Sequence, residues 1–334
     1  MHFEEHIAMT LSGGLDSSAL IGISKSLEFH DISSHSYIYK GLNDSQKKAS
    51  DETKYIQSVI DMHDLDSNFH IFEKDGPLKM LDVSSNFNEP VSGTNIYTYH
   101  KMFQKLKEKK INILFEGIGG DDIIDHGRLR FYELGKKFKL KKLASEYKKF
   151  CYYENKEFKL TNCIKVFVIK PYLSFFLKLI RIRKKENISY FNINLLLKDE
   201  FRVDTKHIFK NIHGYDYENF NFIKYSTDEI TKMKLDDGYD AYVNRAAINM
   251  AREYSIHIVN PYYSQELKNY CQTVPLKEKM KNGKNRYYFR EAIKQYVPEI
   301  VYNRTTKGDM SGMFLNELLE KDYSQIESLL FKDN

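Results

Sequence analysis

The sequence lacks tryptophan, has little cysteine and contains no long uninterrupted run of apolar residues. Its 334 residues include three cysteines, none at Cys-x-x-Cys spacing, so neither a zinc knuckle nor a disulfide framework is expected. The most apolar stretch, residues 164–180, is interrupted by three lysines and a proline and is too polar for a membrane span. The opening residues MHFEEH lack the basic start and apolar stretch of a secretory signal. We therefore expect a cytoplasmic protein with no membrane partner.

The charge balance of the chain excludes few functions. A formal net charge of +5 is mild for 334 residues, so it permits an anionic ligand without requiring nucleic acid. We interpret the lysines between residues 136 and 149 as the solvated face of a helix and expect no nucleic-acid partner. A hydrophobic content of 42% allows a sizeable core in one large domain or two coupled ones.

The first part of the chain alternates between strand and helix patterns. Short apolar runs predict strands at residues 7–11, 35–39, 69–72 and 111–115. Helical spacing predicts helices at residues 17–27, 51–63 and 97–109. Strands that alternate with helices indicate a parallel sheet covered on both faces, a doubly wound α/β fold.

After about Gly127 helical spacing dominates, and we expect no further strands. Pro261, Pro275 and Pro298 are interpreted as stops between long helices. We predict three parts: an α/β core at residues 1–127, a helical insertion at 128–235 and a helical C-terminal part at 236–334. The last part is expected to complete the active site.

Residues 12–18, SGGLDSS, form the most specific motif. They connect a predicted strand to a predicted helix. Glycines let the backbone approach phosphate oxygens, and the N–H groups at a helix start attract anions. No Gly-Lys-Ser/Thr follows, so the motif is not a Walker loop. A serine-rich turn that caps a helix is the simpler alternative, but the full motif favours a phosphate-binding loop.

Two aspartates indicate a metal ion at the same site. Asp16 would repel a bare phosphate, so its presence in the loop makes sense if Mg²⁺ lies between them. Asp121 follows the fourth predicted strand and two glycines, at the edge of the sheet where doubly wound folds bind ligands. An N-cap role for Asp121 or Asp122 is the alternative.

The chain resembles the C-terminal domain family of asparagine synthetases, which are PP-loop ATP pyrophosphatases. Four stretches carry the resemblance: SGGLDSSAL at 12–20, GIGGDD at 117–122, IHIVNPYYSQEL at 256–267, and residues 279–307 with Arg286, Arg290, Pro298, Arg304 and Lys307. PP-loop enzymes cleave ATP between the α- and β-phosphates and leave an adenylated substrate. The resemblance implies the same fold and chemistry here, with ATP and Mg²⁺ as cofactors.

The resemblance also implies site residues. Those expected at ATP are Leu11, Ser12, Gly13, Gly14, Asp16, Ser17, Tyr39, Glu116 and Gly117. Asp16 and Asp121 are expected to hold Mg²⁺. Lys307 is expected to stabilise the charge that develops during amide formation, and Arg286 to face a phosphate as a second catalytic cation.

The sequence departs from the asparagine synthetase pattern at positions that matter for catalysis. His2 stands where the glutaminase nucleophile of that family follows the initiator, so we expect no glutamine hydrolysis by this chain. Ile118 replaces the glutamate of the family's Gly-Glu-Gly loop, and Gly127 replaces an expected tyrosine. His257 and Val259 replace a glutamate and an arginine. These losses argue against plain aspartate amidation.

Residues 116–133 are more similar to the asparagine synthetase homologues that close lasso peptides, as are Arg304 and residues 307–311. Such cyclases adenylate an acidic side chain of a precursor peptide, whose own amino terminus then attacks. The resemblance therefore implies a small-molecule or peptide carboxylate as substrate, with a precursor peptide and a partner protease as candidate partners. His126 or His257 could replace the missing base, although a structural role is the simpler interpretation.

Three alternatives to the cyclase stay open at this point. One is aspartate amidation with ammonia from elsewhere. Another is a tRNA-lysidine synthetase, which would need a strongly basic tRNA-binding extension. The third is a nucleotide-binding homologue that has lost catalysis, which the departures at Ile118, Gly127 and His257 favour. Retention of Asp16, Asp121 and Lys307 argues against that loss.

Overall fold

The fold comes from a computed structural model, which divides into two compact units. It describes residues 6–29, 31–40, 43–44, 47, 50–72, 95–173, 225–235, 239–308 and 322–331. Unit 1 comprises residues 1–124, 238–269 and 288–334, and unit 2 comprises residues 125–237 and 270–287. Neither unit is one continuous stretch of chain. The three-part division expected at residues 1–127, 128–235 and 236–334 stays a prediction.

Unit 1 is built on a five-stranded parallel sheet with the strand order β3-β2-β1-β4-β5. The strands are β1 (Ile7–Thr10), β2 (Ile32–Tyr39), β3 (Asp66–Phe72), β4 (Ile113–Phe115) and β5 (His257–Val259). The predicted α/β fold with a parallel sheet and a mainly helical remainder is confirmed. The chain runs outward from β1 to β3 and returns to place β4 on the other side of β1. The loops after β1 and β4 therefore leave the sheet at its topological switch point, where such folds bind ligands.

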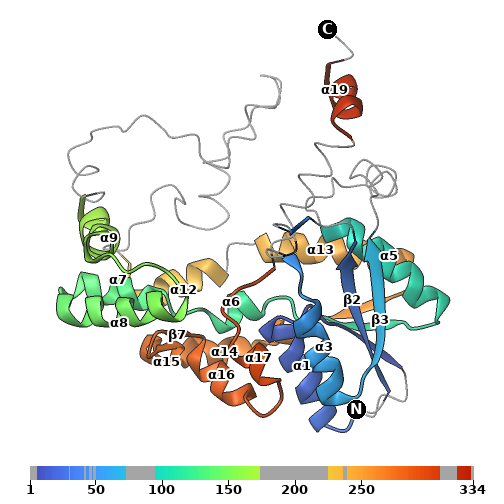
Figure 1. Ribbon diagram of the computed structural model, residues 1–334, viewed down its shortest axis with the longest axis horizontal. Helices are drawn as coiled ribbons and strands as arrows, with labels where there is room; N and C mark the ends of the chain where they lie inside the picture. Colours follow the sequence, from blue (N-terminus) through green and yellow to red (C-terminus); the bar gives the residue numbers. More distant parts are fainter. Residues whose placement is uncertain are drawn as a thin grey trace. The chain divides into compact units, whose positions relative to one another are not determined.

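Helices cover both faces of this sheet (Figure 1). One layer contains α1 (Leu15–Ser26), α3 (Thr53–His63) and α17 (Glu299–Tyr302), and the other contains α5 (Asn95–Glu108) and α13 (Tyr239–Glu253). Alternate residues of β1 divide between the layers, because successive strand side chains point to opposite faces. Met9 packs with the first layer and Ala8 with the second.

Unit 2 is mainly helical. Its elements are α7 (Leu129–Lys136), α8 (Leu140–Tyr153), α9 (Leu160–Ile164), the π-helical turn η1 (Lys165–Ile169), α12 (Thr227–Leu235), α15 (Leu276–Lys279) and the short hairpin of β6 (Met280–Lys281) and β7 (Lys284–Asn285). Unit 1 also contains α6 (Gly120–Ile124), η5 (Pro261–Tyr263) and α19 (Tyr323–Phe331), while α14 (Gln265–Thr273) and α16 (Tyr287–Ile293) cross the unit boundaries. The three cysteines are free and buried, and the lysines of the 136–149 region are exposed as expected.

Two expectations for the C-terminal part were wrong. The stretch His257–Val259 is a strand that pairs with all of β4, and the β6–β7 hairpin follows it. The three prolines start short helices: Pro261 opens η5, while Pro275 and Pro298 are the N-caps of α15 and α17. Pro275 also follows the end of α14 by two residues, as a helix stop would, but that helix is short. The fixed φ and missing N–H of proline suit the start of a helix as well as its end.

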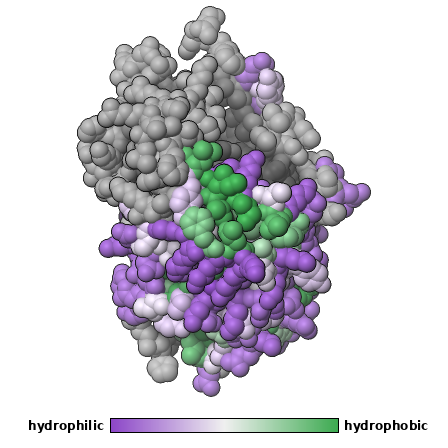
Figure 2. Space-filling model, turned by 90° about the vertical axis from the view of Figure 1, so that its left-hand side faces the viewer, coloured by the Kyte–Doolittle hydropathy of each residue, from purple (hydrophilic) through white to green (hydrophobic). Residues whose placement is uncertain are grey.

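The surface of unit 2 carries exposed apolar side chains. Phe138, Leu140, Leu160, Ile169 and Leu173 are all exposed. Figure 2 shows a contiguous apolar patch on an otherwise mostly hydrophilic face. Within the described ranges, no helix combines the length and the apolar character that crossing a membrane requires.

A chain of polar contacts leads into the sheet of unit 1 from its surface. The His6 ring contacts the Asp31 carboxylate, and its other nitrogen lies 2.8 Å from Ser33 Oγ. Ser33 Oγ lies 3.0 Å from His35 Nε2, and His35 Nδ1 lies 3.0 Å from Nε2 of His70. His35 and His70 are buried. Burial lowers the pKa of His35 to about 3, helped by His70, and the pKa of His70 to about 4, helped by nearby lysines.

This pair predicts an acid-labile contribution to stability. Because the folded-state pKa values lie below 6.5, the unfolded chain binds more protons, so stability is full above pH 6.5 and falls as the pH drops toward 4. Each such histidine adds about 1.4 kcal/mol per pH unit to that slope. In urea unfolding, His70→Gln should flatten the loss of stability between pH 6.5 and pH 4, while the exposed-site control His257→Gln should not. Parallel curves for wild type and His70→Gln would contradict this account.

Candidate active site

The loop between β1 and α1 is held in shape by its own serines. The backbone N–H of Ser12 donates to Ser17 Oγ over 3.2 Å, and the two hydroxyl oxygens lie 3.1 Å apart. The N–H of Gly14 donates to Ser12 Oγ over 3.3 Å. Gly14 is the N-cap of α1 and supplies no side-chain cap for the first turn. The N–H groups at this helix start can therefore serve an anion, and the helix dipole adds to the attraction.

Gly13 can be no other residue without strain. Its φ is +66°, a conformation that favours glycine. A Cβ atom here would lie 2.7 Å from Tyr55 Cβ and 2.9 Å from the backbone nitrogen of Ile56. The loop therefore packs directly on the first turn of α3, which fixes its distance from the sheet.

A second glycine loop packs against the first. Gly117 follows β4, and a Cβ atom on it would lie 2.9 Å from the backbone nitrogen of Ser17. A Cβ atom on Gly120, at the start of α6, would overlap the Asp16 carboxylate. The hydroxyl of Tyr262 donates to the Asp16 carbonyl oxygen over 2.9 Å. Segments after β1, β4 and β5 thus meet at Asp16.

The contact between Gly120 and Asp16 leads to a prediction. In Gly120→Ala the flexible end of the Asp16 side chain can rotate away, so the fold should persist while the carboxylate moves. If Asp16 holds Mg²⁺, as the sequence predicts, displacing its carboxylate should weaken Mg²⁺-dependent ATP binding about 10- to 100-fold. Calorimetry with and without Mg²⁺ measures this, and an unchanged circular dichroism spectrum is the control. Wild-type Mg²⁺-dependent affinity in Gly120→Ala would show that the placement of this carboxylate is unimportant.

Asp16 and Asp121, the carboxylates that follow β1 and β4, fit a metal ion only together with a phosphate ligand. Asp16 lies in the first turn of α1, and Asp121 in the first turn of α6, directly after the glycine that touches Asp16. Among the described residues, no group of three or more histidine, cysteine, aspartate or glutamate side chains could hold a metal. Mg²⁺ is usually held by one or two carboxylates, substrate phosphates and water, so this pair suits a Mg²⁺–triphosphate.

Lys307 reaches this pair directly. Its ammonium lies 2.8 Å from Asp121 Oδ2, across 186 residues of sequence. The lysine side chain is 78% exposed, so the ion pair itself contributes little stability. One carboxylate oxygen cannot serve a lysine and a metal ion equally well. A metal ion on Asp121 would therefore weaken the hold of this carboxylate on Lys307.

Arg304 joins the C-terminal segment to the loop, an arrangement that the sequence did not reveal. Its guanidinium donates to the Gly13 carbonyl oxygen over 2.9 Å and to Glu52 Oε1 over 2.6 Å. It also lies 4.0 Å above the ring of Tyr55. The Gly308 N–H donates to the same Glu52 oxygen over 3.2 Å, so Glu52 binds the segment on both sides of Lys307. Arg304 was noted in the family pattern, whereas Glu52 carried no sequence signal.

Arg290 also contacts the segment that leads to Lys307. It is buried on α16, contacts the Tyr302 carbonyl oxygen and donates to the Arg304 carbonyl oxygen over 2.9 Å. Arg290 thereby satisfies the carbonyl of the last residue of α17 and that of Arg304, two residues later. Arg290 and Arg304 together hold the irregular stretch that carries Lys307.

Glu116 is a buried carboxyl at the carboxyl end of β4. It is 1% exposed, its Oε2 has no hydrogen-bond partner among the described residues, and it forms a hydrogen bond with Tyr99. Burial raises its pKa to about 7, against the opposing effect of Tyr99. The folded state therefore binds more protons between pH 4.5 and 7, so this carboxyl favours folding at low pH and opposes it above pH 7. Near neutrality it can donate or accept a hydrogen bond.

The other residues that the sequence predicts at the active site lie in different parts of the structure. Leu11 is buried and its N–H donates to the His35 carbonyl oxygen over 2.9 Å. Tyr39 ends β2, but its side chain lies outside the described residues. Arg286 belongs to unit 2, where it is buried with a φ of 52°, and its catalytic role stays a prediction. His257 is exposed at the amino end of β5, away from the carboxyl ends that carry the two loops, so it is wrongly placed for the missing base.

Comparison with known proteins agrees with this geometry. The family model described as asparagine synthase matches residues 1–332. A curated relative from Methanocaldococcus jannaschii, "Putative asparagine synthetase (glutamine-hydrolyzing) 2", is 27% identical over 124 residues. That alignment covers 37% of this chain and 23% of the relative, so it spans less than a quarter of the relative's own length.

Proposed function

Because the chain belongs to the asparagine synthase family, whose members use ATP, we propose that it is an ATP-dependent carbon–nitrogen ligase that closes a peptide. The family implies the ligase activity, whereas the peptide substrate is our extension. One observation carries the proposal. The phosphate loop, the Asp16–Gly120–Asp121 contact and Lys307 converge where the strand order of a parallel sheet reverses.

The first step would be adenylation. The loop N–H groups at the start of α1 would hold the β- and γ-phosphates, with Asp16 and Asp121 directed at their metal ion. Mg²⁺ would neutralise the charge of the leaving pyrophosphate. A substrate carboxylate oxygen then attacks the α-phosphorus in line, the bridge to the β-phosphate breaks, and pyrophosphate leaves. The products of this step are an acyl-adenylate and pyrophosphate.

The second step would be amide formation. An amine adds to the activated carbonyl, the carbon–nitrogen bond forms, the bond to AMP breaks and the amine loses a proton. Negative charge grows on the carbonyl oxygen and on the departing AMP. The ammonium of Lys307, which lies beside Asp121, would stabilise this developing negative charge. The contacts of Glu52 with Arg304 and Gly308 would keep this lysine at the site.

The choice of a peptide over free aspartate rests on the residues that have changed. Gly127, where the family pattern has tyrosine, has a φ of +71°, and a Cβ atom on it would lie 2.9 Å from the backbone of Lys279. A tyrosine cannot occupy that position without moving the chain. Ile118 cannot act as an acid or base in the glycine loop. A cyclase that uses the precursor's own amino terminus needs no ammonia, which suits the loss of these groups.

Aspartate amidation is the second candidate. It is favoured by the match to a relative whose printed name is a glutamine-hydrolyzing asparagine synthetase. On this reading the ammonia would come from another protein or from solution. Both candidates share adenylation at the same loop and differ in the carboxylate and the amine.

Product analysis separates these two candidates. The protein would be incubated with MgATP and either aspartate plus ammonium or peptides with a free amino terminus and one acidic side chain at varied positions. We expect AMP and a cyclic product that has lost one water, only with the peptides. An acetylated amino terminus is the matched control and should block closure. Asparagine formed from aspartate while every peptide stays linear would favour the second candidate.

A further inference from the structure

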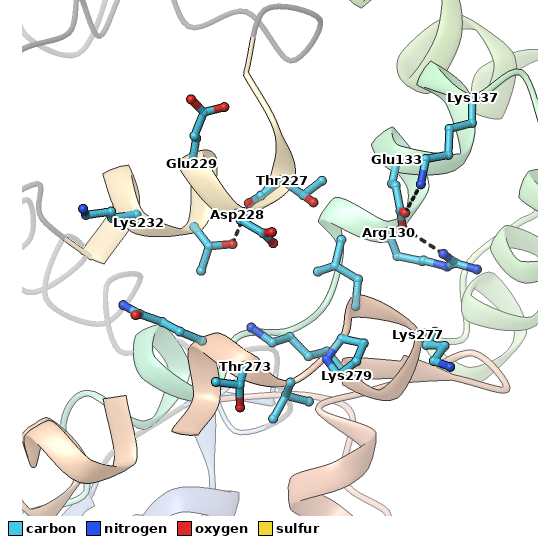
Figure 3. A pocket seen from close by; sticks show the side chains of 15 residues that line it. Arg130, Glu133, Lys137, Thr227, Asp228, Glu229, Lys232, Thr273, Lys277 and Lys279 are labelled. Atoms are coloured by element: carbon cyan, nitrogen blue, oxygen red, sulfur yellow. Dashed lines mark hydrogen bonds and ion pairs between the residues drawn. The ribbon is translucent and has the colours of Figure 1, made fainter. Parts of the chain in front are cut away.

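Unit 2 contains a cavity that the ligase site does not use. Its volume is about 870 Å³, and 15 side chains from α7, α12 and residues 272–279 line it (Figure 3). This volume lies in the upper part of the range for sites that hold drug-sized ligands, about 300–1,000 Å³. A single amino acid would leave most of it empty. The size therefore suits a ligand of several residues.

The charged side chains on the α7 wall of the cavity are paired with one another. Arg130 forms ion pairs with Glu133 at 2.8 Å and with Glu146 at 3.2 Å. Lys137 forms an ion pair with the other oxygen of Glu133 at 2.6 Å. Two cations and two carboxylates thus neutralise one another. This wall offers a ligand little net charge.

The α12 wall presents a carboxylate that the described residues leave without a partner. Ser226 and Glu229 form a capping box, in which the Ser226 N–H donates to Glu229 Oε2 over 2.7 Å and the Glu229 N–H donates to Ser226 Oγ over 3.2 Å. Glu229 is therefore engaged with the helix end. Asp228, beside it, has neither a hydrogen bond nor an ion pair with any described residue.

The opposite wall presents a cation with spare donors. Lys279 is 2% exposed, and the partner of its ammonium is one oxygen of Asp125 at 3.5 Å, the outer limit of a hydrogen bond. An ammonium has three N–H donors, so most of its capacity is unused by described residues. Burying an ammonium with poor partners is costly. Lys279 would gain most from a ligand that brings an acceptor.

Asp228 and Lys279 point into the cavity from opposite sides (Figure 3) and form no ion pair with each other. A ligand between them would need an anionic group for the lysine and a cationic group for the aspartate. Lys232 and Lys277 are exposed lining residues that add positive charge. A peptide segment with an acidic and a basic group meets these demands, whereas a simple anion meets one of them.

We propose that this cavity binds a peptide segment that carries both charges, with its carboxylate on Lys279 and its cationic group on Asp228. The inference concerns unit 2 alone and does not depend on the ligase reaction. It predicts that binding persists without ATP. It also predicts that binding survives replacement of Asp16, which lies in the phosphate loop.

Fluorescence anisotropy of the full chain tests the proposal. The probes are labelled peptides of glycine with glutamate and lysine, with glutamate alone, or with serine in place of both charged residues. The mixed-charge peptide should bind saturably and at least about tenfold more tightly than the serine peptide, since charge-assisted contacts contribute about 1.5–3 kcal/mol. Lys279→Met and Asp228→Asn should each weaken it about tenfold. Asp228→Lys should shift the preference to the glutamate peptide.

Matched controls keep the result decisive if Lys279→Met folds poorly. Asp228 is exposed, so Asp228→Asn and Asp228→Lys should fold normally, as circular dichroism would verify. Lys148→Met and Glu157→Gln remove exposed charges of unit 2 outside the cavity and should not change binding. The proposal is overturned if no peptide binds saturably. It is equally overturned if the two Asp228 variants bind like the controls.

Discussion

Asp16→Asn is expected to remove Mg²⁺-dependent ATP binding. Asp16 belongs to the loop of residues 12–18 and to the first turn of α1, and its carboxylate touches Gly120 just before Asp121. A carboxylate at that place would repel a bare triphosphate, so we expect it to favour ATP binding through a metal ion. Loss of groups around metal ligands already costs 10–100-fold, so loss of a ligand should weaken MgATP binding at least about 100-fold.

Calorimetry with and without Mg²⁺ checks this expectation. Without Mg²⁺, Asp16→Asn should bind ATP at least as tightly as wild type, because the substitution removes a carboxylate that would repel the bare triphosphate. Asp61→Asn is the matched control, since Asp61 is an exposed carboxylate of α3 whose one hydrogen bond within the described part of the chain comes from Gln57. Equal MgATP affinity in wild type and Asp16→Asn would remove this residue from the metal site.

Lys307→Ala is expected to lower turnover about 100- to 1,000-fold, the loss measured when one oxyanion-stabilising donor is removed. The ATP affinity should stay within a few-fold, because the lysine is 78% exposed and an exposed ion pair contributes about 0–1 kcal/mol. A fall in turnover at constant affinity is the signature of an interaction made in the transition state.

Steady-state kinetics and nucleotide titrations measure the two halves of this expectation. Lys307→Arg keeps the charge and should recover part of the activity. Lys294→Ala removes an exposed lysine of the same unit and should behave as wild type. A Lys307→Ala variant with full turnover would refute its catalytic role while leaving the nucleotide site intact. A variant that loses ATP affinity and turnover together would indicate a binding role instead.

The first four strands and the phosphate loop were predictable because their signals are local. An apolar run that ends in Ser-Gly-Gly specifies β1 and the loop without reference to the rest of the chain. The covered parallel sheet followed from the alternation of strands and helices. Element bounds shifted by up to three residues: β2 begins at Ile32 instead of residue 35, and β3 begins at Asp66 instead of residue 69.

The fifth strand could not be read in the same way. The stretch His257–Val259 is three residues long, which is too short to show a period of two. Its strand conformation is set by pairing with Ile113–Phe115, more than a hundred residues earlier. The helical spacing on either side therefore dominated the prediction.

The contacts that hold the Lys307 segment in place could not be predicted from the sequence either. Glu52 and Arg304 meet across 252 residues, and neither lies in a motif that predicts the other. The resemblance identified Asp121 and Lys307 as members of one site, but assigned them separate tasks. The structure adds that the two side chains form an ion pair, with the Lys307 ammonium 2.8 Å from Asp121 Oδ2.

The most direct test of the account is the fate of ATP labelled at its α-phosphate. The protein would be incubated with the labelled nucleotide, Mg²⁺ and the candidate carboxylates and amines, and the nucleotide products separated by chromatography. The account predicts labelled AMP with an equal amount of pyrophosphate, dependent on an accepting carboxylate and lost in Asp16→Asn. Labelled ADP with inorganic phosphate would contradict it, because the bond broken would then lie between the β- and γ-phosphates.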